Sequence, residues 1–390
     1  RRMSGGHRLS TGGVIDRGQT LRFRFDGRDY AGHPGDTLAS ALLASGVRVF
    51  GRSFKYHRTR GLLAAGVEEP SALVGAGEGG RFEPNTRATD LHLYDGLVSE
   101  SQNRWPSLDL DVGAVNQWIA PFIPAGFYYK TFLGPPALWK LYEHVIRAAA
   151  GLGRPPQLPD PDRYERRAAF CDVLVVGAGP AGLSAALAAA RSGARVALVD
   201  LDSRLGGSLL GDPVTVDGQP AKDWIDAAEA ELRTRDVRIL TRTTAIGYYD
   251  HNLLYLAQRV VEPGARTGTD EISQRMWRMR AGRVILAQGA IERPLPFEDN
   301  DRPGIMLSGA VRTYLDRFGV AAGERFVLAT SSDDAYRTAI RLCDAGLRVD
   351  AVLDARPSEA IDPPCSGALG TGARWRQGSA RCGPLARPGA

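Results

Sequence analysis

Apolar and polar residues alternate near the start of the chain. In the stretch TLRFRFDG, residues 20–27, apolar side chains at 21, 23 and 25 alternate with polar ones, and Asp26 and Gly27 follow. Alternation with a period of two is typical of a strand with one buried face, and Asp-Gly is a hairpin-turn sequence. The pattern therefore predicts two antiparallel strands joined at this pair.

The next pattern, in GDTLASALLASG at residues 35–46, has helical spacing. Leucines at 38, 42 and 43 share one face, Asp36 or Thr37 can serve as the N-cap, and Gly46 ends the helix. Two strands followed by a short helix and a loop are typical of the start of a ubiquitin-like or ferredoxin-like β-grasp fold.

From residue 171 onwards, buried runs are joined by turns and helices. The stretch CDVLVVGAGPAGLSAALAAARSGARVALVDLD, residues 171–202, reads as one βαβ unit. Another buried run ends in a glycine turn at residues 281–294, and residues 323–357 repeat the order strand, helix, strand. These patterns predict parallel strands joined by right-handed crossovers throughout this part of the chain.

Within the βαβ unit, Gly177, Gly179 and Gly182 form G-x-G-x-x-G between the strand and the helix. The first glycine allows the tight turn, the second lets a pyrophosphate approach the backbone, and the third lets helix and strand pack closely. Pro180 and Ala181 complete the turn, where phosphates would lie at the positive end of the helix. The sequence therefore predicts a dinucleotide site.

Asp200 follows the second strand, about 20 residues after the turn, where the fingerprint places an acid on the ribose 2′-hydroxyl. A carboxylate there disfavours NADP, whereas NAD and FAD both remain open. Gly206 and Gly207 offer a second close backbone approach, with Arg204 beside them as a further candidate contact. They resemble the same segment of flavoproteins with two dinucleotide-binding domains, and Gly289 resembles a later glycine turn of those proteins.

The patterns divide the chain into five parts. We predict a flexible tail at 1–12, a ferredoxin-like β-grasp domain without a cluster at 13–108, an aromatic and helical connector at 109–165, and a Rossmann-like FAD/NAD(P)-binding domain at 166–362. Residues 363–390 lack periodicity, and we interpret them as an irregular tail after a truncation or frameshift, with a disordered tail as the alternative. The predicted fold class is thus α+β followed by α/β.

Composition narrows the class of protein. The 390 residues include 49 basic and 44 acidic side chains for a net charge of +5, and the arginines are scattered, so we expect anionic small ligands and no nucleic acid. The four cysteines form no C-x-x-C pair, the six histidines are dispersed, and no signal peptide opens the chain. We therefore expect no metal site, no membrane span and a cytoplasmic protein, with no catalytic group identified.

One loop raises a question about cofactors. GRSFKYHRTRG, residues 51–61, is built like the approach to an iron–sulfur loop, yet no cysteine occurs between residues 1 and 170. Such clusters are held by cysteine thiolates. The sequence therefore predicts no iron–sulfur cluster.

Several long stretches resemble one family, the α subunit of heterotetrameric sarcosine oxidase; related opine and amino-acid dehydrogenase α subunits share parts of them. These stretches, within residues 8 to about 357, are STGGVIDRGQTLRFRFDG, GRSFKYHRTRGLL, VEEPSALV, PAGFYYKTF, RTTAIGYYDHN and GAIERPLPFEDNDRPGIMLSGAVRTYL. The resemblance implies a β-grasp domain like a 2Fe-2S ferredoxin whose cysteines are absent, and NAD held at the Gly177 motif, with FAD as the alternative ligand.

The resemblance also implies partners. FAD would lie on a β subunit that oxidises the amine substrate, FMN would lie between α and β, and γ and δ subunits would complete the heterotetramer. The folate-binding half of a full-length α subunit is missing here, and this chain alone would not be catalytic. Two alternatives stay open: a self-sufficient FAD-dependent amino-acid or opine dehydrogenase subunit, and a non-catalytic assembly scaffold.

Overall fold

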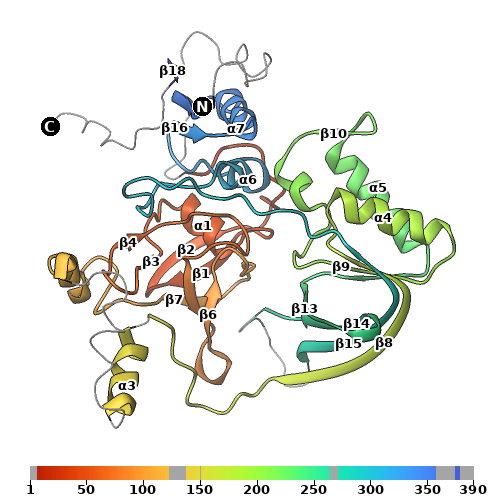
Figure 1. The fold of residues 1–390 in the computed structure, drawn as a ribbon, viewed down its shortest axis with the longest axis horizontal. Helices are drawn as coiled ribbons and strands as arrows, with labels where there is room; N and C mark the ends of the chain where they lie inside the picture. The colour runs from red at the N-terminus through yellow and green to blue at the C-terminus, as the bar shows by residue number, and fades with distance from the viewer. Residues whose placement is uncertain are drawn as a thin grey trace.

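The computed structural model describes residues 7–122, 138–149, 151–262, 265, 271–356 and 374–377. Figure 1 shows two β-rich regions, one from the first hundred residues and one from residues 163–286, with helices α6 and α7 above the first. Within the described ranges, no helix is long and apolar enough to cross a membrane.

The N-terminal sheet has five strands in the order β2-β1-β7-β5-β6. The elements of this region are β1 (Leu21–Phe25), β2 (Arg28–Gly32), α1 (Leu38–Ala44), β3 (Gly51–Arg52), β4 (Thr59–Arg60), β5 (Leu73–Ala76), η1 (Gly79–Arg81), β6 (Glu83–Arg87) and β7 (Leu97–Ser101). Strand β1 pairs antiparallel with β2 and parallel with β7. The turn residues Asp26 and Gly27 have φ values of 48° and 75°. The predicted hairpin is therefore confirmed.

Helix α1 is held at its start by reciprocal hydrogen bonds. Thr37 Oγ1 accepts from the Ser40 amide at 3.2 Å, and Ser40 Oγ accepts from the Thr37 amide at 3.0 Å. All seven residues of the helix are buried, and its leucines pack with Phe23 and Phe25 of β1 in one core. The choice that the sequence left open between two N-caps falls on Thr37.

The second sheet has six strands in the order β12-β9-β8-β15-β14-β13. Its region contains β8 (Arg163–Val176), α4 (Pro180–Arg191), β9 (Val196–Val199), η5 (Gly207–Gly211), β10 (Thr215–Val216), β11 (Gln219–Pro220), α5 (Ala221–Arg233), β12 (Val237–Leu240), β13 (Thr243–Tyr249), η6 (Asp250–Asn252), β14 (Leu253–Arg259) and β15 (Ile272–Leu286). The predicted βαβ unit is present as β8-α4-β9, with parallel pairing.

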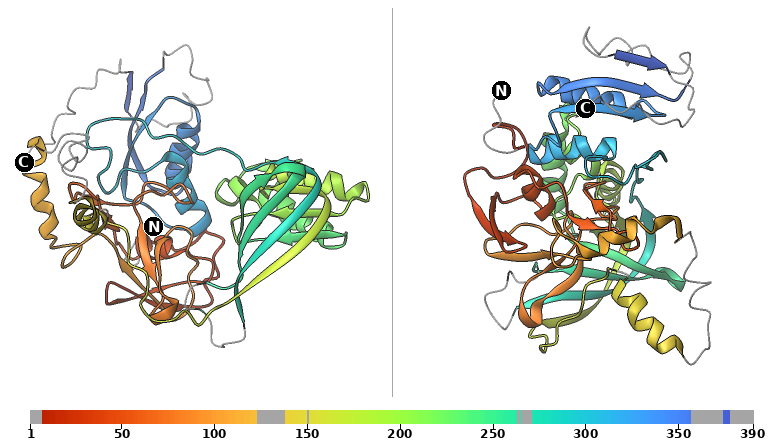
Figure 2. Two further views of the ribbon diagram at one scale, coloured as in Figure 1. Left: turned by 60° about the horizontal axis from the view of Figure 1, so that its bottom comes forward. Right: turned by 90° about the vertical axis from the view of Figure 1, so that its left-hand side faces the viewer.

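The expectation of parallel strands throughout is wrong for two of the five strand pairings in this sheet. Strands β13, β14 and β15 pair antiparallel in sequence order, whereas β12, β9, β8 and β15 run parallel. The three-residue turn at Asp250–Asn252 is too short for a crossover helix, so β13 and β14 can only form a hairpin. Figure 2 shows β8 and β15 as long adjacent strands that reach toward α4 and α5.

A third sheet follows, in the order β16-β17-β18. Its region contains α6 (Ser308–Phe318), β16 (Arg325–Thr330), α7 (Asp334–Asp344), β17 (Arg348–Asp354) and β18 (Arg374–Gln377). Outside the sheets lie η2 (Val112–Gln117), η3 (Ala120–Phe122) and α3 (Trp139–Ala149). The predicted strand-helix-strand repeat at 323–357 is confirmed, but it forms a sheet separate from the one that contains β8.

Helix α6 packs into the N-terminal core. Tyr314 and Phe318 of α6 belong to the same buried cluster as α1, and the Tyr314 hydroxyl donates to the Ala64 carbonyl at 3.1 Å. The Leu9 amide bonds to the Gly319 carbonyl at 2.8 Å, so part of the predicted tail 1–12 is anchored. Strand β8 crosses the predicted limit between residues 165 and 166, and the predicted range 166–362 spans two sheets. The predicted limits 13–108, 109–165 and 166–362 stay predictions. The predicted irregular tail 363–390 lies almost wholly outside the described residues.

We expect Thr37→Ala to lower the free energy of unfolding by about 1 kcal/mol, because the Ser40 amide loses its side-chain acceptor in a buried turn. Denaturant titration followed by circular dichroism measures the change. Thr37→Ser keeps a hydroxyl and serves as the control. Equal midpoints for the alanine variant and the wild type would show that the cap does not stabilise the fold.

Candidate functional site

Three backbone segments converge at the C-terminal end of β8. Gly177 has a φ of 102°, and its amide donates to the Val199 carbonyl at 2.8 Å. A Cβ added at Gly182 would lie 1.7 Å from the Gly177 oxygen, and one added at Gly177 would lie 2.3 Å from the Ala287 oxygen. Only glycine can occupy either position, so the turn, α4 and the end of β15 meet backbone to backbone.

Gly179 has space beside it. It is the N-cap of α4, with a φ of −70°, and a Cβ added there would have the Gly207 Cα, 4.0 Å away, as its nearest neighbour. No side chain of the described residues caps the helix, and Pro180 lies in its first turn without an N–H. The first-turn amides of the exposed Ala181 and the buried Gly182 lack helical acceptors, which is the arrangement that binds anions.

Gly206 and Gly207 lie against this turn. Their φ values are 123° and 54°, and the Gly206 amide donates to the Ala178 carbonyl at 2.8 Å. A Cβ added at Gly207 would lie 2.8 Å from the Gly179 Cα. The two glycine segments that the sequence singled out are therefore in contact, and a side chain on Gly207 would push them apart.

Asp200 joins the turn to the end of β9. Its Oδ2 accepts from the Ala178 amide at 2.5 Å, and its Oδ1 accepts from the Asp202 amide at 2.7 Å. Burial raises the pKa of this carboxyl, against the effect of the two backbone hydrogen bonds. Each carboxylate oxygen can accept a second hydrogen bond, so the predicted contact with a ribose stays a prediction.

The two remaining candidates make no hydrogen bond with the turn among the described residues. Arg204 donates from its guanidinium to the Val14 carbonyl at 3.0 Å, toward the N-terminal domain. Gly289 has a φ of 73° and open space around it. The sequence did not reveal the ion pair between Asp202 and Arg317, with distances of 2.6 and 2.8 Å, because the partners are more than a hundred residues apart. Burial favours the neutral form of Asp202, but the neighbouring Arg317 holds the pKa of Asp202 below the usual value.

The loop at residues 51–61 is fixed by its own contacts. His57 Nδ1 lies 2.6 Å from Asp111 Oδ2, and Arg52 Nη1 donates to the His57 carbonyl at 3.0 Å. Arg58 lines a cavity of about 690 Å³ together with Tyr56 and Arg302. His57 and Asp111 thus serve to hold the loop in place.

A second cavity, of about 150 Å³, lies between the N-terminal domain and the six-stranded sheet. Its lining residues are Asp90, His92, Leu201, Arg242, Thr244, Ala257, Gln258, Arg259, Glu262 and Gln274. Burial lowers the pKa of His92 to about 4 and raises the pKa of Glu262 to about 7, the latter against the effect of Arg259 and Arg242. The walls of this cavity come from segments distant along the chain, so no local sequence pattern predicts it.

Comparison with known proteins identifies both regions. Residues 18–104 match the family described as 2Fe-2S iron-sulfur cluster binding domain, and residues 172–266 match the family described as FAD dependent oxidoreductase. The sarcosine oxidase alpha subunit of Rhizobium meliloti (strain 1021) is 53% identical over 91% of this chain and 36% of its own length. The chain belongs to the family of sarcosine oxidase alpha subunits.

Other relatives agree with this assignment. The sarcosine oxidase alpha subunit of Corynebacterium sp. (strain P-1) is 40% identical over 94% of this chain and 33% of that protein, and an opine oxidase subunit of Rhizobium meliloti is 35% identical over 48% of the chain and 36% of that protein. The chain thus spans about a third of the length of the curated relatives it matches. Among solved structures, L-proline dehydrogenase from P. horikoshii shares the fold, with a TM-score of 0.57 and 20% identity over 87% of this chain and 54% of that one.

One prediction is corrected by these matches. The sequence predicted that this chain has no iron–sulfur cluster, and the match of residues 18–104 to a 2Fe-2S cluster binding domain contradicts that prediction. The matched residues contain no cysteine, so they do not supply the thiolate ligands of such a cluster.

Glu262→Gln should change how stability depends on pH. A carboxyl with a pKa of 4.5 in the unfolded chain and about 7 in the folded one stabilises the fold at low pH, and this contribution is lost as pH rises through 7. The wild type should therefore lose about 2 kcal/mol more than the variant between pH 5 and pH 8. Urea titrations at both pH values measure this.

Glu229→Gln in α5, at a partly exposed glutamate that pairs with Arg233, is the control for this measurement. It should follow the wild type at both pH values. Identical pH dependence in wild type and Glu262→Gln would show that Glu262 titrates near its ordinary range.

Proposed function

We propose that this chain binds an adenine dinucleotide, with the pyrophosphate at the start of α4. The observation that supports this most strongly is the space at Gly179, which faces first-turn amides that have no helical acceptor. Gly177 and Gly182 would hold the turn in shape, while Pro180 and Ala181 would present the helix end to the phosphates.

The neighbouring residues would bind the adjoining parts of the ligand. Asp200 would accept from the ribose 2′-hydroxyl with the lone pairs that the backbone amides leave free, and it would repel a 2′-phosphate. Gly206 and Gly207 would let the second backbone segment close on the ligand, and Gly289 would leave room at the far side. Arg204 would contribute only if it left the Val14 carbonyl.

NAD and FAD share the half of the ligand that this geometry addresses. The match of residues 172–266 to FAD dependent oxidoreductases supports FAD as the ligand. The resemblance to sarcosine oxidase α subunits implies NAD at the same site. Either cofactor would accept or donate a hydride when bound; the residues of this chain would position its ADP half.

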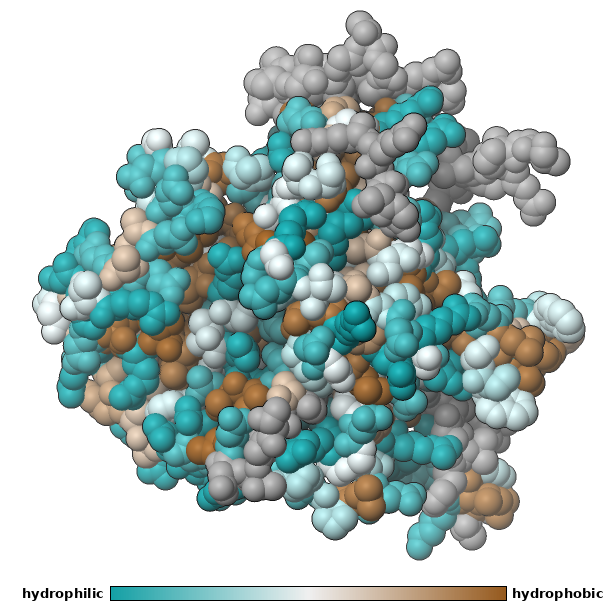
Figure 3. All heavy atoms as spheres, turned by 180° about the vertical axis from the view of Figure 1, so that it is seen from behind, coloured by the Kyte–Doolittle hydropathy of each residue, from teal (hydrophilic) through white to brown (hydrophobic). Residues whose placement is uncertain are grey.

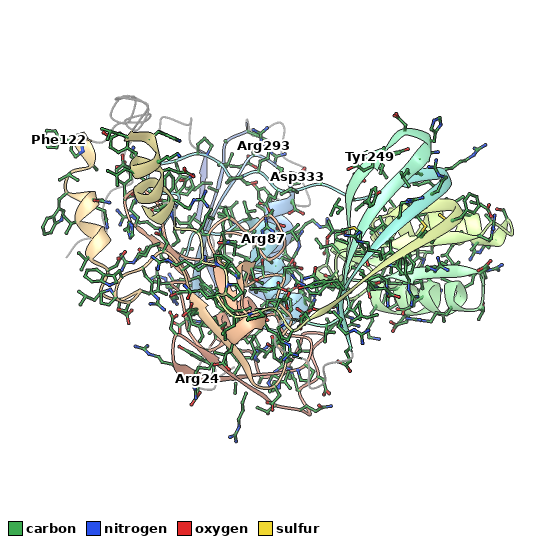
Figure 4. All side chains as sticks on the ribbon, turned by 90° about the horizontal axis from the view of Figure 1, so that it is seen from below. Arg24, Arg87, Phe122, Tyr249, Arg293 and Asp333 are labelled. Atoms are coloured by element: carbon green, nitrogen blue, oxygen red, sulfur yellow. The ribbon has the colours of Figure 1, made fainter. Side chains whose placement is uncertain are left out.

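The chain would act as the dinucleotide-binding subunit of an oxidoreductase complex like sarcosine oxidase, which would remove the methyl group of an N-methyl amino acid by oxidation. The relatives are named as subunits, so other subunits would supply the amine site. Exposed apolar side chains suit such partners: Trp118 and Phe122 are 83% and 85% exposed, and Figure 4 shows Phe122 at the outer edge of the molecule.

One face of the molecule is mixed in hydropathy. On the face drawn in Figure 3, apolar groups form separate clusters among polar residues. Trp118 and Phe122, near η2 and η3, would be the contact area for a partner subunit.

Mass spectrometry of the small molecule released when the purified protein is denatured tests the proposal. We expect NAD or FAD. Yellow protein that releases FAD would favour the self-sufficient dehydrogenase, and colourless protein that releases NAD would favour the dinucleotide-binding subunit. Absence of both, combined with no binding of either on titration, would leave only the scaffold.

Gly179→Val should weaken dinucleotide binding without unfolding the chain. The new side chain would occupy the space proposed for the pyrophosphate, while the ordinary φ of Gly179 allows a substitution without strain. We expect affinity to fall roughly tenfold or more, with the melting temperature of the nucleotide-free protein unchanged. Titration calorimetry and thermal melting measure the two quantities.

Gly323→Val is the matched control, because Gly323 has an ordinary φ and a Cβ there would meet no atom closer than 3.9 Å. It should bind the dinucleotide like the wild type. Unchanged affinity in Gly179→Val would place the ligand elsewhere.

A further inference from the structure

The cavity between the two domains contains a buried acceptor with an unused hydrogen-bonding position. Glu262 has only 7% of its side chain exposed, and within the described ranges its Oε1 has no hydrogen-bond partner. Its other oxygen, Oε2, lies 3.4 Å from Arg259 Nη1, and Arg242 Nη1 lies 3.9 Å from Oε1. A buried polar atom without a partner is rare in proteins, and it indicates a missing donor.

The cavity adjoins the ribose end of the proposed dinucleotide site. Leu201, which lines it, directly follows Asp200, and the Thr243 amide donates to the Asp200 carbonyl at 2.8 Å. Thr244 and Arg242 line the same wall. The cavity therefore lies beside the position proposed for the ribose.

Size and chemistry restrict what the cavity can hold. Its volume of about 150 Å³ is below the roughly 300–1,000 Å³ of sites for whole ligands, so it suits a single ring system. Asp90 and His92 reach it from the N-terminal domain. The free Oε1 needs an N–H or O–H donor, and an exocyclic amino group on a base provides one.

We propose that the cavity receives the base of the bound dinucleotide and that Glu262 Oε1 recognises its amino group, with Asp90 and His92 of the N-terminal domain forming the opposite wall. This inference rests on the proposed function. Both domains would then contribute residues to the base site. Glu262 would select a purine with an amino group over a purine with an oxygen at the same position.

The test compares ADP with IDP, whose bases differ in that one group. Nucleotide-free protein is titrated with each by calorimetry at pH 8, where Glu262 can accept. The wild type should bind ADP about tenfold more tightly than IDP, because IDP leaves a buried carboxylate oxygen facing another acceptor. Glu262→Gln should reduce this preference to near unity, since an amide can present either its oxygen or its amino group.

Glu262→Ala removes the acceptor altogether and should also lose the preference, while Glu229→Gln should keep it. Thermal melting confirms that each variant is folded. Equal affinity of the wild type for ADP and IDP, or an undiminished preference in both Glu262 variants, would overturn the inference while leaving the dinucleotide site intact. Failure of the wild type to bind either nucleotide would instead overturn the proposed function.

Discussion

The contact of backbone with backbone at the end of β8 is the constraint on which the second domain depends. Gly177, Gly182 and Ala287 approach so closely that no side chain fits between them. This contact brings the start of α4 to the end of the parallel strands β8 and β15, and the Asp200 carboxylate secures the turn through the Ala178 amide. Free helix amides and a carboxylate thereby lie side by side.

Polar contacts tie the domain of the six-stranded sheet to α6, and α6 belongs to the N-terminal core. The Asp202–Arg317 pair links the end of β9 to α6, and α6 in turn is buried against α1. The cavity with Glu262 also lies between the two domains, so its shape depends on how the domains pack against each other. Any ligand group in this cavity would contact residues of both domains.

Local sequence patterns predicted much of the fold. The hairpin at Asp26 and Gly27, the helix behind Thr37 and the βαβ unit around Gly177 all follow from residues close together in sequence, where periodicity and turn chemistry act directly. The antiparallel pairing of β13 to β15 did not follow, because the pattern within one strand does not show which strands pair with it. Asp90 and Glu262 share no local pattern, so only the folded chain brings them to one cavity.

The burial of α6 in the N-terminal core makes the ferredoxin-like region a composite of distant segments. Residues 18–104 match a family of their own, but Tyr314, Phe318 and Val320 complete their apolar interior. A fragment of residues 18–104 alone would expose the apolar face that α6 covers. A transplant of this module into another protein would have to carry the helix with it.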